Sequence, residues 1–253
     1  MKTLIFLIVL IPFILNSQEK GTLKFDFNCG YQAFQMDRLN TNINDPSYLD
    51  TMLFKEFSTI RLDKGLSFNF GASYQPFRLF NIGLDGSYQF GSAERKFEAV
   101  LNQFDPLTPN EVIAGKRMHE VSAISFGITS EFLIHNLKSW KRLVTLKRLE
   151  SVLNFKVGYA WSKMLWNDYF ISNSEIIKRE YKSNGLHLAA RLKIGYTILR
   201  SPIFSTLGFS IGYQYLQTTD LKSREGAFFR KESNKTNLDF SGITAGLYLT
   251  VGK

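Results

Sequence analysis

The sequence is poor in cysteine and histidine, and both shortages restrict its chemistry. Cys29 is the only cysteine among 253 residues, so the chain cannot form an internal disulfide or a zinc site built on cysteine pairs. The only histidines are His119, His135 and His187, and they show no metal-ligand spacing. The sequence also has no glycine-rich phosphate loop. It therefore predicts no cofactor and no metal site.

Long apolar runs are absent after the first residues. The one run, Leu4–Leu15, follows Lys2 and precedes the small and polar residues 16–18. This order is typical of a secretory signal, and the run is too short for a transmembrane helix. Residues 1–17 are therefore predicted to be a cleavable signal peptide, with an uncleaved anchor as the alternative, and 18–253 the mature domain. No later stretch is long and apolar enough to predict a transmembrane helix.

What the chain has instead is alternation at period two. Its last stretch alternates the apolar Ile243, Ala245, Leu247, Leu249 and Val251 with Thr244, Gly246, Tyr248 and Thr250. Seven earlier stretches alternate in the same way, within 23–32, 66–75, 80–90, 123–132, 153–162, 186–197 and 206–215. Each has about the length of a tilted membrane strand. A terminal strand needs a partner, and pairing with the first strand would close a barrel.

Alternation alone does not say which face is inside, because a lipocalin has the same period with its apolar face inward. The polar register here is rich in glycine: Gly30, Gly71, Gly83, Gly91, Gly127, Gly158, Gly195, Gly208, Gly212 and Gly246. Glycine weakens a strand on a soluble outer surface, whereas a narrow eight-stranded lumen has room only for small residues. The glycines therefore favour a polar lumen and an apolar, lipid-facing exterior.

The connections and the aromatic residues indicate the same arrangement. Long polar connections cover 35–63, 92–117, 163–183 and 217–235, and tight ones lie near 76–79 and 199–202. Aromatic residues of the apolar register gather near the long-loop ends (Tyr31, Tyr88, Tyr159, Trp161, Tyr213, Tyr215) and near the other rim (Tyr74, Phe80, Phe132, Tyr196). Long outer loops, short periplasmic turns and two girdles are typical of outer-membrane barrels. The prediction is an all-β fold: a monomeric, eight-stranded, antiparallel up-and-down transmembrane β-barrel in the bacterial outer membrane.

These strands resemble the small OmpA/OmpX-type barrels and, more loosely, the PorT-like outer-membrane barrels of Gram-negative bacteria. The resemblance covers Leu23 to Lys253. The last strand also resembles the signal read by the barrel-insertion machinery, with matches at Thr244, Gly246, Leu249 and Val251. The resemblance implies that this machinery is a partner. The family often ends in an aromatic residue, whereas Val251 stands at that position here.

Seven charged residues fall in the predicted inward register: Lys24, Asp26, Asp85, Glu131, Lys156, Arg191 and Lys193. Buried charges must pair or be hydrated. The favoured interpretation is a salt-bridged plug, and the alternative is a selectivity constriction, although eight strands leave no open pore.

The histidines give little support for catalysis. The only local cluster begins at His119, and Ser122 lies three positions later, on the opposite face of a strand. His187 faces inward beside Arg191. The sequence therefore predicts a non-enzymatic protein with a structural or binding role, or a subunit of an envelope assembly. The alternatives are a lipid-directed enzyme and a narrow small-solute channel.

One connection is longer than a periplasmic turn requires. Residues 136–150 include the basic and aromatic side chains Lys138, Trp140, Lys141, Arg142, Lys147 and Arg148. Apolar residues recur there at helical spacing, which predicts a short interfacial helix, with two elongated strand ends as the alternative. The segment is either an anchor on anionic headgroups or a docking site for a periplasmic or envelope protein.

The net charge of +9 does not indicate nucleic acid, because an exported barrel does not meet it. The outer loops carry mixed charge. Their expected partners are outer-membrane lipids and the sugar and phosphate groups of lipopolysaccharide, with plain solvation as the alternative.

Overall fold

The computed structural model describes residues 22–44, 59–101, 111–137, 139–140, 148–170, 176–199, 204–226, 229 and 235–252. The predicted signal peptide, 1–17, lies outside the described residues. Most of the predicted basic segment, 136–150, also lies outside them. In the described part of the chain, no helix is long and apolar enough to cross a membrane.

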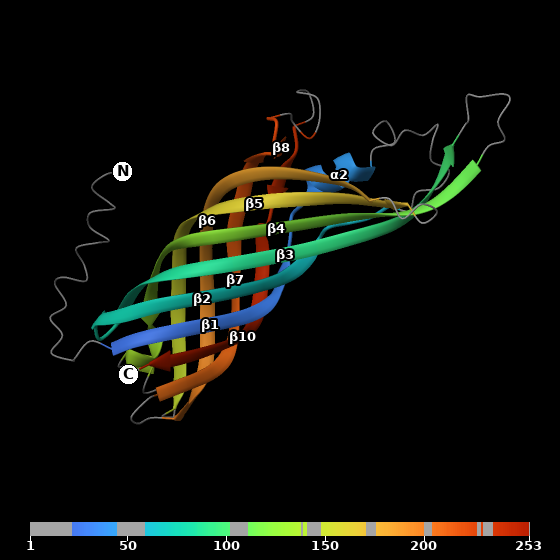
Figure 1. Ribbon diagram of the computed structural model, residues 1–253. Coiled ribbons are helices and arrows are strands. Elements are labelled where there is room, and N and C mark those ends of the chain that lie inside the picture. Colours follow the sequence, from blue (N-terminus) through green and yellow to red (C-terminus); the bar gives the residue numbers. More distant parts are fainter. Residues whose placement is uncertain are drawn as a thin grey trace.

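Eight long strands form a closed antiparallel ring (Figure 1). They are β1 (Thr22–Ala33), β2 (Lys64–Phe77), β3 (Phe80–Leu101), β4 (Glu111–Leu133), β5 (Leu149–Phe170), β6 (Ile176–Leu199), β7 (Phe204–Asp220) and β10 (Gly242–Gly252). Each long strand pairs with the next, and β10 pairs with both β7 and β1. The closing seam aligns Phe27 with Leu249 and Gln32 with Thr244. The predicted all-β, eight-stranded antiparallel barrel is confirmed.

Alternate residues of each strand face opposite sides of the barrel wall, and the outward side is apolar. Phe126 is 62% exposed and Phe209 is 72% exposed, whereas Ser125, between outward neighbours, is buried. The exposed belt includes Leu23, Phe25, Phe27, Leu66, Phe70, Leu84, Ile124, Ile128, Val157, Trp161, Ile211 and Leu247. A closed barrel satisfies every backbone group within its wall, and an apolar exterior of this size needs lipid around it. The ring is therefore a transmembrane barrel of the outer-membrane type.

Glycines allow neighbouring strands to approach closely on the lumen side. Gly127 of β4 is paired with Gly158 of β5, and Gly30 of β1 is paired with Gly246 of β10. A Cβ atom on Gly127 would lie 2.4 Å from the carbonyl oxygen of Val157 and 2.7 Å from the Cα atom of Gly158. Both contacts are with backbone, which cannot rotate away. These positions therefore require glycine.

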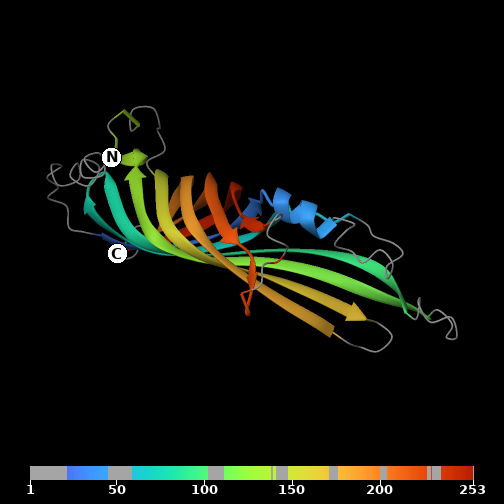
Figure 2. The same cartoon turned by 90° about the horizontal axis from the view of Figure 1, so that it is seen from above.

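Four strands continue beyond the belt, and two connections predicted as long loops are largely strand. β3 continues to Leu101 and β4 begins at Glu111, so the predicted loop over 92–117 is wrong in its bounds. β5 continues to Phe170 and β6 begins at Ile176, so the predicted loop over 163–183 is wrong in the same way. Figure 2 shows the green β3–β4 ribbon running far past the barrel mouth. The alternation persists here, but its apolar side changes, which hid these strand ends from a search for outward apolar residues.

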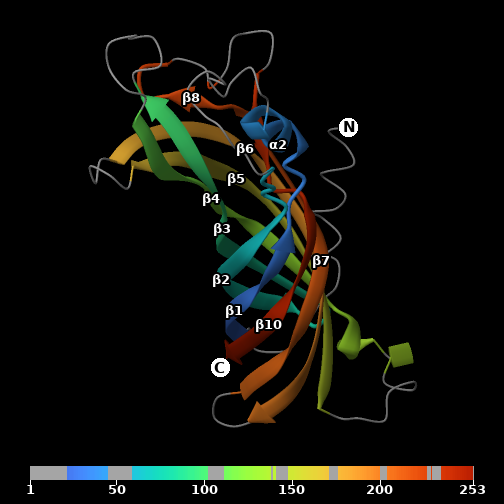
Figure 3. The same ribbon diagram turned by 90° about the vertical axis from the view of Figure 1, so that its right-hand side faces the viewer.

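The extended strand ends form an outer head together with short elements from the remaining connections. We define the head as the parts of β3–β6 beyond the apolar belt, together with α2 (Asp37–Asn44), β8 (Lys222–Ser223), β9 (Asn237–Asp239) and the segments that join them. Figure 3 shows α2 and β8 at the end of the molecule opposite the C-terminus. The predicted loops over 35–63 and 217–235 thus contain a helix and a strand, respectively. At the other end, the short helix η1 (Ile134–Asn136) follows β4.

The head has an apolar core of its own. α2 contributes Leu39 and Ile43, both fully buried. The core consists of Phe34, Met36, Leu39, Ile43, Ile60, Leu62, Val121, Ala123, Ala160, Met164, Trp166, Leu216, Leu221, Phe229, Leu238 and Phe240. It lies directly above the lumen, so the barrel is polar inside while the head is apolar inside.

Candidate functional site

The lower part of the lumen holds a three-charge cluster. Lys193 of β6 places its Nζ 2.7 Å from Oε1 of Glu131 and 3.5 Å from Oδ1 of Asp26. Asn81 donates a 2.7 Å hydrogen bond to Oε2 of Glu131, and Asn154 donates one of 3.3 Å to Oε1. The carboxylate of Glu131 is thus bonded from β3, β5 and β6. Such a buried group is tolerated because its partners surround it.

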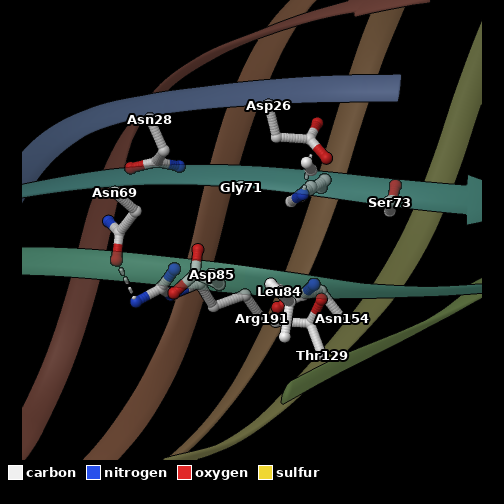
Figure 4. A pocket seen from close by; sticks show the side chains of 12 residues that line it. Asp26, Asn28, Asn69, Gly71, Ser73, Leu84, Asp85, Thr129, Asn154 and Arg191 are labelled. Carbon is white, nitrogen blue, oxygen red and sulfur yellow. Dashed lines mark hydrogen bonds and ion pairs between the residues drawn. The ribbon is translucent and has the colours of Figure 1, made fainter. Parts of the chain in front are cut away.

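A second cluster lies on the head side of the first. Lys156 forms an ion pair with Asp85 and also donates to Ser125 over 3.1 Å. Arg191 donates a 2.8 Å hydrogen bond to Oδ1 of Asn69, as the dashed line in Figure 4 shows. These contacts tie β2, β3, β4, β5 and β6 together through side chains across the lumen.

The structure places all seven charges named from the sequence inside the barrel. Lys24, Glu131, Lys156, Arg191 and Lys193 are buried, and Asp26 and Asp85 are half-buried. Lys156 pairs with Asp85, and Glu131 pairs with Lys193. The alternation located these residues, but it could not say which would meet across the lumen.

The space left between the clusters is very small. Figure 4 shows it between Asn69, Asp85 and Arg191. Its volume is about 20 Å³, with Asp26 and Lys193 also in its lining. That is enough for about one water molecule and too little for an organic solute. At this level the lumen is a packed polar core.

A serine–histidine pair lies inside the lumen and was missed by the sequence analysis. Ser125 Oγ and His187 Nδ1 are 2.6 Å apart. The two residues lie on β4 and β6, so only their shared inward register could have indicated the contact. A serine hydroxyl within hydrogen-bond distance of a histidine is the arrangement of a nucleophile and its general base. Ser125 is 1% exposed and His187 is 0% exposed, however, so neither is accessible to a substrate, and the pair contributes to packing.

Glutamines close the lumen below the head. Gln89 donates a 3.0 Å hydrogen bond to Oε1 of Gln214, across the barrel from β3 to β7. Gln214 donates in turn to the carbonyl oxygen of Phe240 over 2.9 Å, and Gln32 donates to the same oxygen over 2.5 Å. The Phe240 ring packs edge-on against Phe34, with 5.2 Å between ring centroids. The polar lumen therefore ends against the apolar core of the head.

A buried ion pair joins β4 to β5 in the head. Arg117 donates to Asp168 through Nε over 2.5 Å and through Nη2 over 3.0 Å, a bidentate arrangement. Trp166 donates from Nε1 to the same carboxylate over 2.9 Å, and the Arg117 guanidinium lies 4.6 Å from the Trp166 ring centroid. The arrangement satisfies the carboxylate and holds β4 against β5 beyond the membrane.

His119 lies beside this pair and is fully buried. Its ring packs edge-on against Trp166 with 5.0 Å between centroids, and neither ring nitrogen has a hydrogen-bond partner among the described residues. Burial, together with the positive charges of Arg95 and Arg117, lowers the pKa of His119 to about 3. The imidazole is therefore neutral at ordinary pH. Among the described residues, no cluster of three His, Cys, Asp or Glu could hold a metal ion.

Arg95 connects the helix to the sheet. Its Nη2 donates a 3.0 Å hydrogen bond to the carbonyl oxygen of Ile43 at the end of α2. Burial and the nearby charge of Arg117 lower the pKa of Arg95 to about 10, while Asp168 acts in the opposite direction. Arg95 remains charged at neutral pH and serves as a cap for a helix end.

The structure also locates the remaining residues named from the sequence. In β10, Thr244 faces inward and Gly246 lies against Gly30, whereas Leu249 and Val251 are on the outward register. Their reading by the insertion machinery stays a prediction. In the basic segment, Trp140 is half-buried and Arg148 is exposed. Lys138, Lys141, Arg142 and Lys147 lie outside the described residues.

Comparisons with known proteins do not assign this chain to a family. No protein-family model matches this chain, and no curated protein does. Among solved structures, the outer membrane protein OprG from Pseudomonas aeruginosa is similar at 8% identity and a TM-score of 0.41, over 92% of this chain and 95% of that one. Neisserial surface protein A is similar at 8% identity and 0.38, over 91% and 94%. The outer membrane protease OmpT from Escherichia coli is similar at 10% identity and 0.32, over 91% and 95%. Likeness at these scores carries no argument about function, and the fold rests on the strand pairing itself.

Proposed function

We propose that this protein is a non-conducting, non-enzymatic outer-membrane barrel whose function, structural or binding, resides in its outer head. The observation that carries this proposal is the contrast between a lumen packed with paired charges and a head with a core of its own. A barrel with no role outside the membrane needs only short connections between strands. Here four strands continue past the apolar belt and hold α2 above the lumen.

The orientation follows from the connections. The tight turn between β2 and β3 lies at the same end as Thr22 and Gly252, opposite the head. Outer-membrane barrels place short turns in the periplasm and long connections outside the cell. The head therefore faces the exterior and meets lipopolysaccharide, while the basic segment 136–150 is available to an envelope protein or to the inner leaflet. The strand β10 remains the candidate signal for the insertion machinery.

Labelling in intact cells tests the orientation. The chain has one native cysteine, Cys29, on the outward register of β1. A Glu98→Cys variant should react with a membrane-impermeant maleimide in intact cells, because Glu98 is exposed in the head. An Arg148→Cys variant should react only after the outer membrane is permeabilised. The reverse pattern would place the head in the periplasm.

Conductance tests the sealed lumen. The purified chain in a planar bilayer should give no stable openings, because paired charges and glutamines fill the lumen. A trimeric porin in the same bilayer serves as the positive control. Reproducible conductance steps from the purified chain would contradict the proposal and favour the narrow channel. Hydrolysis of a lipid ester that is lost in Ser125→Ala would favour the enzyme instead.

A further inference from the structure

The segment Ile176 to Glu180, at the start of β6, forms an open edge of the sheet in the head. It pairs with β5 on one side without a register shift. On the other side, β8 pairs with β6 only at Tyr181 and Lys182, and the pairing with β7 begins at Gly185. Among the described residues, no strand pairs with that side of residues 176–180. Alternate residues of the open edge therefore direct their backbone N–H and C=O groups away from the sheet.

Side-chain contacts hold the open edge in its extended conformation. The Arg179 guanidinium lies 5.2 Å from the centroid of the Trp166 ring on β5. Trp166 is itself buried and donates a 2.9 Å hydrogen bond to Asp168. Next to the open edge, the Tyr181 ring packs edge-on against Phe229 with 4.9 Å between centroids. The strand is therefore ordered before a partner arrives, so binding does not have to supply the free energy of ordering it.

Each face of the open edge combines an exposed isoleucine with a cation. Arg179 lies on the same side of the sheet as Trp166, and Ile177, two positions away, shares that side. Ile176 and Lys178 lie on the opposite side. Ile176 is 46% exposed and Ile177 is 37% exposed. Both lie beyond the apolar belt, so a strand added at this edge would cover one isoleucine on each face.

The two cations of the open edge have no carboxylate partner in the described part of the chain. Lys178 and Arg179 take part in none of its ion pairs. Glu180 contacts Lys182 over 3.1 Å. Opposite charges directly across an antiparallel pair stabilise it, and like charges destabilise it. A second copy of this chain has two cations and one acid on the same edge, so it cannot place an acid opposite both cations.

We propose that the open edge of β6 binds an extended acidic segment of another protein, which adds a strand to the head sheet. The inference rests on the proposed function, which makes the outer head the binding region. Backbone hydrogen bonds to residues 176–180 supply affinity, and side chains on both faces supply selectivity. In antiparallel pairing, the added strand places two acidic residues opposite Arg179 and Lys178. Two β-branched residues follow, opposite Ile177 and Ile176.

Binding of synthetic peptides to the full-length protein in nonionic detergent micelles tests this site. The probe is the fluorescein-labelled peptide Thr-Thr-Glu-Glu-Val-Val-Thr-Thr, and fluorescence anisotropy gives its dissociation constant. A second peptide carries lysine in place of both glutamates. Two further peptides carry N-methyl groups on alternate residues, one at the odd and the other at the even positions.

The protein variant is Lys178→Glu. Its matched control is Lys96→Glu, at another exposed lysine in the head, on β3. Heat-modifiable migration on a gel shows that each variant is folded. Amide hydrogen exchange of residues 176–180, with and without the acidic peptide, locates the binding.

The acidic peptide should bind the wild type and Lys96→Glu equally. Its affinity for Lys178→Glu should fall on the order of tenfold, because an attractive cross-strand pair becomes a repulsive one. The lysine peptide should bind Lys178→Glu better than it binds the wild type. Only one of the two N-methylated peptides should lose binding, because an added strand directs alternate N–H groups to the sheet. The acidic peptide should slow amide exchange in residues 176–180.

Equal binding of both N-methylated peptides would overturn strand addition, and equal losses in Lys178→Glu and Lys96→Glu would overturn its position. Slow exchange of residues 176–180 without peptide, together with a dimeric mass in detergent, would assign the open edge to a second copy and overturn the acidic partner. Because this assay depends on neither orientation nor conductance, it can fail while the proposed function stands, and the reverse also holds.

Discussion

The barrel and the head are built from the same strands in opposite ways. In β3, Leu84 faces lipid at 69% exposure while its neighbour Asp85 faces the lumen. Further along the same strand, Lys96 faces outward and Phe97 is buried. The same alternate residues of β3 face outward in both parts, and only the polarity of the two faces reverses. Lipid surrounds the first part and water the second, so each part places apolar side chains on the side away from water.

The two regions should therefore fail in different ways. Damage to the lumen should prevent insertion or unfold the whole ring, because each strand pairs with two neighbours in a closed barrel. Damage to the head should loosen the outer strand ends and leave the membrane part intact. Substitutions in each region test this difference.

The largest effect is expected for Gly127→Val in the barrel wall. The new side chain would meet the backbone of Val157 and Gly158, and the cost should exceed the ~1–3 kcal/mol of ordinary overpacking. The variant should fail to fold into lipid vesicles, as judged by heat-modifiable migration and circular dichroism. Ala72→Val is the control, because Ala72 lies on the outward register beside lipid. A folded Gly127→Val barrel would contradict the close approach of β4 and β5.

The next effect is expected for Lys193→Met in the lumen. Without the ammonium, the carboxyl groups of Glu131 and Asp26 lose the positive charge that they share. Removing one member of a buried pair costs about 3–5 kcal/mol. The free energy of unfolding from urea titration in vesicles should fall by that amount and recover in part when Glu131→Gln is added. Lys64→Met, at an exposed lysine, should change little, and no recovery in the double variant would contradict the pairing.

The sequence was sufficient for the barrel because lipid imposes a simple rule. Phe126 and Ile128 alternate with Ser125 and Gly127 wherever lipid lies outside and a narrow lumen inside. A search for the same pattern could not identify the strands of the head. Beyond Phe90, the outward residues of β3 become charged, so the strand looked as if it had ended.

The partners within the lumen and the head could not be read from the sequence. Lys156 meets Asp85 although 71 positions separate them, and register alone does not say which inward groups meet across a ring. In the head, Leu39 and Ile43 stand four positions apart, which is a helical spacing, but so short a pattern is weak evidence without the sheet that covers it.

A smaller and local effect is expected for Leu39→Ala in the head. The fully buried Leu39 side chain joins α2 to the head core, and such truncations cost about 2–5 kcal/mol. Amide hydrogen exchange should accelerate in residues 114–121 of β4 and remain unchanged in 124–132 within the membrane. Arg38→Ala, exposed on the same helix, is the control. Faster exchange in both parts of β4 would show that the two regions unfold together.

The smallest effect at neutral pH, and one that grows with acid, is expected at His119. The folded pKa is lowered to about 3 from an ordinary 6.5, so the neutral ring contributes its stability above pH 6.5. That contribution is lost as the pH falls from 6.5 towards 3, because the opened head takes up a proton that the closed head excludes. At pH 5 the loss should be about 2 kcal/mol. The positive charges of Arg95 and Arg117 act on the ring, and Asp168 is held by Arg117.

His119→Phe separates this effect from other titrations. The new ring keeps the edge-on contact with Trp166 and carries no nitrogen that lacks a partner. At pH 7 the head of the variant should be as stable as the wild type, and at pH 5 it should be more stable. Hydrogen exchange of residues 114–121, compared between the two proteins at each pH, measures this difference and cancels the intrinsic pH dependence of exchange. His187 is present in both proteins, so its titration cancels as well. Equal protection of the two proteins at pH 5 would mean that the buried His119 ring accepts a proton without opening the head. If the barrel unfolds independently of the head, residues 124–132 should show no difference between the two proteins at either pH.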